Sequence, residues 1–302
     1  MGHEHGHAAA ADARRGPLWA ALLLLLAFML GEVAVAFWSG SLALLSDAGH
    51  MLSDVGAIGA SLWAMSLAAR PPAGSWTFGW KRAEILSAAG NGLTLAVVAG
   101  VLAVEAIRRL VSPTPVQGVP VIVVAGVGVA INLAATWLLA RANRTSLNVE
   151  GAYQHIVTDL FGFIGTLLAG VVILVTGWVR ADPVASLVVV ALMLRAAWGL
   201  LRDSGRVLLE AAPQDIALEE IRAHLLSTEH VHNVHDLHVW TVTSGLPTLS
   251  VHVVVDDSCF TDGHAPQLLD SLQECLVGHF DVEHSTFQLE PASHAQHESG
   301  MH

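Results

Sequence analysis

The chain has 302 residues, of which 53% are hydrophobic and only 13% are charged, a composition too apolar for a soluble domain and typical of a membrane protein. Its 14 Lys and Arg residues against 26 Asp and Glu leave no positive stripe, which excludes a nucleic-acid-binding protein. The two cysteines, Cys259 and Cys275, show neither CxxC spacing nor a disulfide framework, so thiolate chemistry is not expected to carry the function.

Six apolar runs follow one another along the first two thirds of the chain. A helix needs about 20 residues to cross a hydrocarbon core of about 30 Å. The runs lie near residues 17–38, 43–68, 84–110, 119–140, 151–177 and 181–201, and they predict a six-helix transmembrane domain over 17–206. The first run follows Arg14 and Arg15, as a secretory signal would, but it is too long for one and lacks a clear A-x-A cleavage site.

The distribution of Lys and Arg predicts the orientation of these spans. Positive residues accumulate on the cytoplasmic side of membrane proteins. One side carries Arg14, Arg15, Arg70, Lys81, Arg82, Arg141, Arg144, Arg202 and Arg206, and the other carries Arg108, Arg109 and Arg180. We therefore expect both termini in the cytoplasm and a multi-pass protein of the inner membrane.

Two copies of the pattern His-x-x-x-Asp lie inside the apolar runs, His50 with Asp54 and His155 with Asp159. Four residues are about one helical turn, so each pair projects from one helix face. Charged groups at this depth are costly and usually serve transport, and two such pairs together offer four ligands. Imidazole nitrogen with carboxylate oxygen suits tetrahedral Zn²⁺ first, while Co²⁺, Cd²⁺, Ni²⁺ and Fe²⁺ stay open. The alternative is that each pair forms only a local hydrogen bond.

Other polar residues of the spans have simpler interpretations. Asp47 shares the face of His50 and is either an extra ligand or proton carrier, or a cap near the membrane boundary. Glu32 is a proton site or an interhelical polar contact, and Asn132 is interpreted as an interhelical contact. Gly126 and Gly128 favour close helix packing, because no strand precedes them as in a nucleotide-binding loop.

After residue 206 the apolar density falls and a small α+β domain is predicted over 207–291. An amphipathic helix near 216–228 precedes two strands near 234–243 and 246–255 with a turn at Ser244–Gly245. A helix over 265–279 and a strand over 285–290 complete the order α-β-β-α-β. The flanking tails, 1–16 with His3, His5 and His7 and 292–302 with His294, His297 and His302, are expected to be disordered.

Six segments together resemble the cation diffusion facilitator family of zinc transporters. They are SLALLSDAGHMLSD (41–54), TFGWKRAEIL (77–86), SLNVEGAYQHIVTD (146–159), ADPVASLVV (181–189), and HDLHVW (235–240) with TFQLE (286–290). The resemblance spans roughly residues 17–291. It implies homodimers of six-span subunits with a metallochaperone-like cytoplasmic domain, which export Zn²⁺ in exchange for protons and use no organic cofactor.

The same resemblance implies the site residues. The transport site falls on His50, Asp54, His155 and Asp159. Regulatory zinc at the dimer interface would bind to His235, His252 and Glu290, with His284 or His264 as supplements. Trp80 stands where some bacterial members place a histidine, so a second metal site in the loop before it is not expected.

His238 is left out of the cytoplasmic site, because three residues along a regular strand it would point to the face opposite His235. Metal binding needs neutral imidazole and ionised carboxylate, so protons and Zn²⁺ compete for one site and an antiporter with alternating access is the expected mechanism. A non-translocating zinc sensor is the first alternative. A metal-dependent hydrolase is a weaker one, since four ligands close the site and no HExxH occurs.

Overall fold

The computed structural model describes residues 4–39, 42–113, 118–141, 146–280, 282 and 284–295. The chain divides into two compact units, Met1–Ser204 and Gly205–His302. The division falls inside a helix, two residues before the predicted boundary at 206.

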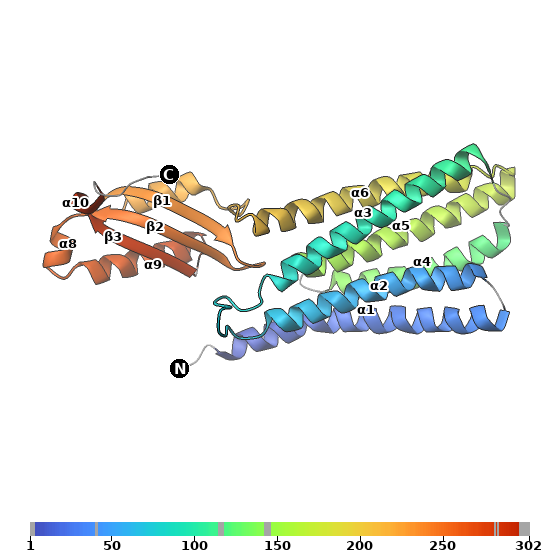
Figure 1. The fold of residues 1–302 in the computed structure, drawn as a ribbon, viewed down its shortest axis with the longest axis horizontal. Helices are drawn as coiled ribbons and strands as arrows, with labels where there is room; N and C mark the ends of the chain where they lie inside the picture. Colours follow the sequence, from blue (N-terminus) through green and yellow to red (C-terminus); the bar gives the residue numbers. More distant parts are fainter. Residues whose placement is uncertain are drawn as a thin grey trace. The chain divides into compact units, whose positions relative to one another are not determined.

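The first unit is a bundle of six helices, one for each predicted span (Figure 1). Their bounds are α1 Glu4–Ser39, α2 Leu42–Ala68, α3 Ala83–Val111, α4 Gly118–Ala140, α5 Leu147–Thr176 and α6 Ala181–Leu208. By length and composition, α3, α5 and α6 suffice to cross a membrane, and the described parts of α1, α2 and α4 contain shorter apolar stretches. The predicted class, a helical membrane protein, is confirmed.

The N-terminal tail differs from the prediction of disorder. Helix α1 begins at Glu4 and runs without interruption into the first span. The physical reason lies in Ala8–Ala11, because alanine has the highest intrinsic helix propensity. At the other end of the chain His294 lies in a short helix, α10 (Ala292–Ala295), while His3, His297 and His302 lie outside the described residues.

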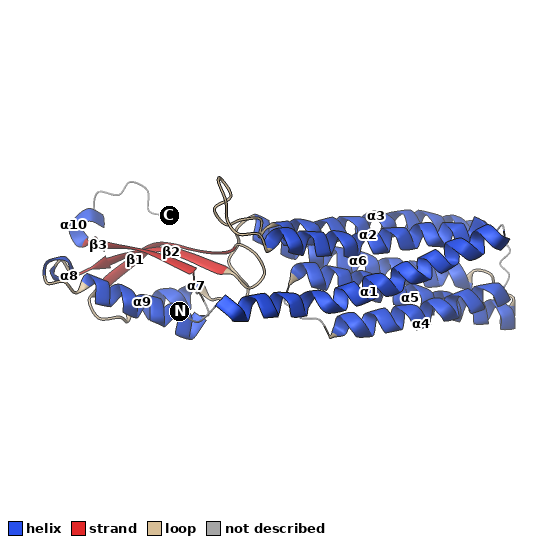
Figure 2. Ribbon diagram, turned by 90° about the horizontal axis from the view of Figure 1, so that it is seen from below, coloured by secondary structure: helices blue, strands red, loops and turns tan. Residues whose placement is uncertain are grey.

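The two larger apolar cores of the bundle join different sets of helices, and a smaller one joins α5 to α6 through Ala169, Ile173 and Ala181. One core joins α1, α2, α4 and α5 and includes Leu18, Ile58, Leu139 and Ile156. The other joins α3 to α6 through small and medium side chains such as Ala99 and Ala197. The helices of the bundle run lengthwise beside one another (Figure 2).

The second unit is a three-stranded sheet with helices on it. Helix α7 (Leu218–Leu226), strands β1 (Val231–Thr241) and β2 (Pro247–Val255), helices α8 (Ser258–Thr261) and α9 (Ala265–Phe280), and strand β3 (His284–Pro291) follow in order. The strands lie in the order β1-β2-β3, with β1 antiparallel and β3 parallel to β2. The α-β-β-α-β prediction is confirmed, with α8 and α10 as additions.

Alternation along the strands gives this sheet two chemically different faces. Leu249, Val251, Val253 and Val255 of β2 pack into a core with α7 and α9, which cover one face (Figure 2). The residues between them, His252 included, point to the other face. The polar face is therefore the one away from α7 and α9.

Candidate metal sites

The intramembrane cluster brings together ligands from α2 and α5. Nε2 of His155 lies 2.7 Å from Oδ1 of Asp54 and 3.8 Å from Oδ2 of Asp159. Asp54 is 6% exposed and His155 is 5% exposed, so the three groups are almost removed from solvent. Ligand atoms of the three residues lie within 4.8 Å of one another, as a shared metal ion requires. The structure therefore pairs the two predicted helices across one site.

Three residues that the sequence singled out have side chains outside the described part of the chain: His50, Asp47 and Glu32. His50 belongs to α2, one helical turn before Asp54. Its role as the fourth ligand stays a prediction.

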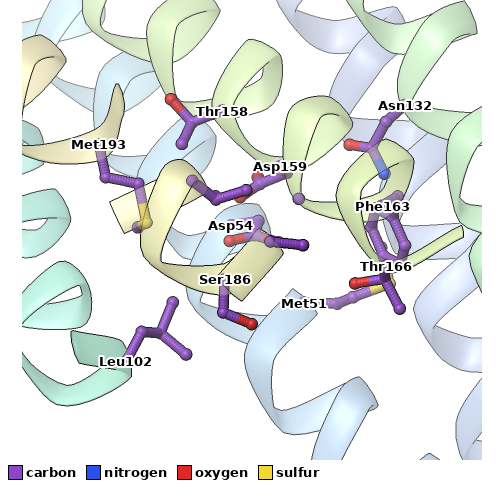
Figure 3. A pocket seen from close by; sticks show the side chains of 13 residues that line it. Met51, Asp54, Leu102, Asn132, Thr158, Asp159, Phe163, Thr166, Ser186 and Met193 are labelled. Atoms are coloured by element: carbon purple, nitrogen blue, oxygen red, sulfur yellow. The ribbon is translucent and has the colours of Figure 1, made fainter. Parts of the chain in front are cut away.

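A cavity of about 200 Å³ borders the cluster (Figure 3). Asp54 and Asp159 lie next to each other in its wall, and α3, α4 and α6 complete the lining. Beyond the two carboxylates, Thr166 of α5 and Ala185 and Ser186 of α6 line the cavity. These residues lie toward the end of the bundle where α5 is followed by α6, so the hollow extends from the cluster in that direction.

Toward the opposite end, three polar side chains join α2, α3 and α5. Nδ2 of Asn148 donates to the carbonyl oxygen of Ser61 at 2.9 Å, and Nδ2 of Asn91 donates to the hydroxyl of Ser61 at 3.3 Å. All three residues are buried. Asn148 and Ser61 each lie seven residues, or about 10 Å along a helix, from a cluster residue. Sequence reasoning missed this network, because each member alone looks like an ordinary polar residue in a span.

Asn132 and Gly128 of α4 fit their sequence interpretations to different degrees. Nδ2 of Asn132 donates to the carbonyl oxygen of Gly128 in its own helix, and the Asn132 side chain lines the cavity. The predicted hydrogen bond from Asn132 to another helix is therefore wrong for its side-chain N–H group. A Cβ at Gly128 would lie 2.3 Å from the ring of Phe163, which confirms that this glycine permits close packing of α4 on α5. Gly126 has nothing within 4 Å of that position.

A second cluster lies on the polar face of the sheet in the second unit. Nδ1 of His252 lies 2.7 Å from Oε1 of Glu290, and Nε2 of His235 lies 3.5 Å from Oε2. Glu290 is 1% exposed, and its ligand atoms lie within 4.8 Å of those of both histidines. A carboxylate buried this completely needs a cation or a protonated partner beside it. Two imidazoles with one carboxylate are a donor set that fits Zn²⁺.

The exclusion of His238 from this face is wrong, because β1 contains a bulge. His235 pairs with His252 and His238 with Ser250, so Asp236 and Leu237 together oppose one residue of β2. Asp236 has a φ of 49°, in the left-handed region. The extra residue returns His238 to the face of His235, where it lies 2.9 Å from Asp236, and Asp236 lies 3.8 Å from His252.

The two supplementary histidines do not join the cluster within one subunit. His284 is the first residue of β3, and six residues separate it from Glu290, about 20 Å along a parallel strand. His264 lies instead beside His230, with ring centroids 5.7 Å apart. In the loop between α2 and α3, Trp80 stacks on Trp76 at 4.2 Å, and the predicted absence of a metal site there stays a prediction.

Outside both clusters, Asp256 accepts hydrogen bonds from two histidines. One is His232 of β1, and the other is His230, which directly precedes that strand. Hydrogen bonds with His232 and then His230 lower the pKa of Asp256 from 3.8, and the bond with Asp256 raises the pKa of His230 from 6.5. The contribution of His230 to the stability of the folded domain is complete below about pH 6.5 and is lost as pH rises through the raised pKa of His230. That from Asp256 is present above 3.8 and is lost as pH falls through its lowered pKa.

We therefore expect Asp256→Asn to lower the melting temperature of this domain more at about pH 5.5 than at about pH 8.5. The shift is small, because both partners are exposed and screened by solvent. Thermal denaturation followed by circular dichroism checks it, with the exposed Asp270→Asn on α9 as the control. An equal shift at both pH values would contradict the assignment.

The chain matches two family descriptions in sequence. Residues 18–209 match the cation efflux transmembrane domain, and residues 213–292 match the cytoplasmic domain of cation efflux proteins.

Three curated relatives are similar over nearly the whole chain. Zinc transporter ZitB of Escherichia coli (strain K12) is 39% identical over 297 residues, which cover 96% of this chain and 93% of the relative. Metal cation efflux system protein CzcD of Cupriavidus metallidurans is 38% identical over 301 residues, which cover 100% of this chain and 93% of the relative. A cadmium, cobalt and zinc/H(+)-K(+) antiporter of Bacillus subtilis (strain 168) is 36% identical over 296 residues, which cover 97% of this chain and 93% of the relative.

Among solved structures, the metal-bound C-terminal domain of the CzcD transporter of the same Cupriavidus species is 37% identical. The match covers 25% of this chain and 99% of the solved CzcD domain, with a TM-score of 0.23.

Proposed function

Because this chain belongs to the cation efflux family, we propose that it exports Zn²⁺ from the cytoplasm in exchange for protons, at a site made by His50, Asp54, His155 and Asp159. The relatives' names support zinc as the substrate and proton antiport as the coupling. The protein is a transporter and not an enzyme. We further propose an inner-membrane location with both termini in the cytoplasm.

One observation carries the proposal: the shortest contact of the cluster joins two atoms that would both bind the metal. Nε2 of His155 and Oδ1 of Asp54 lie at hydrogen-bond distance, 2.7 Å. A proton held between them occupies the ligand positions that Zn²⁺ needs. Zinc must displace that proton to bind, and a returning proton must displace zinc, so competition for these atoms couples the two fluxes.

The polar network supplies a cytoplasmic closure. With the predicted orientation, α5 begins on the cytoplasmic side, so Asn148, Ser61 and Asn91 lie between the cluster and the cytoplasm. The cavity extends the other way, toward the outside. This arrangement supports an outward-facing state in which protons reach the carboxylates and zinc leaves.

Alternation between the two states has a structural basis in the two cores. The cluster lies in the group of α1, α2, α4 and α5, while α3 and α6 line the cavity opposite it. We propose that the α3–α6 pair shifts against the other group, which opens the cytoplasmic end as the outer cavity closes.

The cytoplasmic domain is proposed to form the dimer and to bind regulatory zinc through His235, His252 and Glu290. Zinc at these residues neutralises the buried carboxylate of Glu290 and draws β1, β2 and β3 together. If this state of the domain suits one conformation of the membrane helices better than the other, cytoplasmic zinc biases transport through that difference in affinity.

Flux measurements on purified protein in liposomes test the function. A pH gradient is expected to drive zinc accumulation, reported by a zinc-sensitive dye trapped inside, and a protonophore is expected to stop it. Zinc binding without flux in the same preparation would favour the non-translocating sensor instead.

The proposed closure predicts the effect of Asn148→Ala. An interhelical hydrogen bond inside a membrane is worth about 0.6 kcal/mol on average, so its loss is expected to favour the inward-facing state about threefold. The apparent affinity for zinc supplied from the cytoplasmic side should rise by the same factor, measured from the zinc dependence of the initial flux.

The matched control is Asn132→Ala, which removes a buried asparagine whose side-chain donor bonds, among the described residues, to Gly128 of its own helix. An equal rise in this control, or a fall in Asn148→Ala, would contradict the closure.

A further inference from the structure

A third group of metal-ligating side chains lies on the helical side of the second unit. His224 comes from α7, and Cys275 and His279 come from α9, one helical turn apart. One ligand atom of each lies within 4.8 Å of the other two. The group is distinct from the His235 cluster, because α7 and α9 cover the opposite face of the sheet. Fifty-one residues separate His224 from Cys275 in the sequence, so spacing alone does not reveal it.

One ring nitrogen of His279 is held by a hydrogen bond within α9. Its Nδ1 lies 3.1 Å from the carbonyl oxygen of Cys275, to which it donates. This hydrogen bond places the proton on Nδ1 and leaves Nε2 as an acceptor. Metal-ligating histidines commonly donate their second ring N–H to a backbone carbonyl in this way.

The second imidazole stands beside the first. The ring centroids of His224 and His279 are 4.4 Å apart, and the planes are inclined by 47°. His224 also contacts the edge of Phe280 at 5.7 Å, which limits the movement of its ring. His224 and Cys275 are half-buried and His279 is exposed, so an ion has a path to the three ligands.

Acidic groups border the same place. Asp215 and Glu220 line a hollow together with His279 and Phe280. Glu220 lies on α7 one turn before His224, so the two residues share a helix face. Of the three ligands, His279 lines this hollow, so a cation that approaches His279 from there meets the negative charge of Asp215 and Glu220.

We propose that His224, Cys275 and His279 form a binding site for a thiophilic divalent cation, Zn²⁺ or Cd²⁺, with Glu220 or a water as the fourth ligand. This inference goes beyond the proposed transport function and does not depend on it. One sulfur and two imidazole nitrogens suit tetrahedral Zn²⁺ and select against hard cations such as Mg²⁺ and Mn²⁺.

The sulfur ligand gives the test a signal that the other two sites cannot produce, because they contain only nitrogen and oxygen ligands. Full-length protein in detergent is titrated with Co²⁺ and, separately, with Cd²⁺, and the thiolate-to-metal charge-transfer absorbance is recorded. We expect the band to appear in the wild type and in Cys259→Ser, and to disappear in Cys275→Ser. Cys259 is a matched control because it is 1% exposed and does not belong to the group of His224, Cys275 and His279.

His279→Ala and His224→Ala extend the test to the imidazoles. Each is expected to weaken Cd²⁺ binding, read from the charge-transfer titration, by about tenfold or more. Alkylation of Cys275 in the wild type should also slow about tenfold at a Cd²⁺ concentration ten times its Kd. Alkylation of the thiol still reports on the site if a histidine variant proves hard to purify.

Two outcomes would overturn the proposal. One is a wild-type protein without the charge-transfer band whose Cys275 alkylates at the same rate with and without Cd²⁺. The other is a band of equal strength in Cys275→Ser. Either result would mean that the three side chains only pack against one another.

Discussion

Replacing Asp54 or Asp159 with asparagine is expected to abolish proton-driven zinc flux in liposomes. The amide keeps the size of the carboxylate but has no negative charge, so it binds Zn²⁺ poorly and carries no proton. The loss should exceed the roughly 100-fold reduction that follows when only a partner of a metal ligand is changed. Asp54→Asn should also alter the competition between protons and zinc, since Asp54 forms the 2.7 Å contact with His155.

Two controls separate loss of the site from loss of the fold. Asp203→Asn removes a carboxylate of α6 that lines a different groove, and Ser186→Ala changes the lining of the same cavity without removing a charged ligand. Both should retain flux within a few-fold of the wild type. Flux that survives in Asp54→Asn and Asp159→Asn would refute the assignment of the transport site.

Glu290→Gln is expected to remove zinc from the cytoplasmic cluster while the domain stays folded. The Glu290 carboxylate contacts both His235 and His252 and is the charged ligand of the cluster. Its replacement by a neutral amide should therefore lower the zinc affinity of that cluster by about 100-fold or more. Without metal the variant should be at least as stable as the wild type, because it no longer buries a carboxylate.

Zinc titration of full-length protein in an Asp159→Asn background measures this, since the transport site then contributes little binding. Glu274→Gln on α9 is the matched control, because it changes an exposed carboxylate on the other side of the sheet. Unchanged zinc stoichiometry in Glu290→Gln would contradict the proposed ligand set.

Much of the transport site was predictable from the sequence because its parts are local. The spacing of His155 and Asp159 by one helical turn and their place in an apolar run are visible without any structure. The direct contact is not local: the shortest distance joins His155 to Asp54, 101 residues away, and not to Asp159. Which His binds which Asp in the proton-bound state depends on how α2 packs against α5.

The cytoplasmic domain shows where strand periodicity fails. The family resemblance grouped His235 with His252, and the structure pairs them directly. Strand alternation failed at His238, because a bulge adds one residue to β1 and reverses the face of every residue after it. His284 lies away from the cluster of its own subunit for a different reason, since residues at the two ends of one strand are far apart even when they share a face.

The two His-x-x-x-Asp pairs, the six spans and the order of the small domain follow from the sequence by itself. Each depends on periodicity, length or polarity within one helix or strand, and these properties are set by neighbours along the chain. Tertiary structure alone decided the hydrogen bonds among Asn148, Ser61 and Asn91, the bulge that returns His238 to its face, and the meeting of His224 with Cys275 and His279. These depend on contacts between segments that are distant in sequence, where packing of whole elements and not local propensity determines which side chains meet.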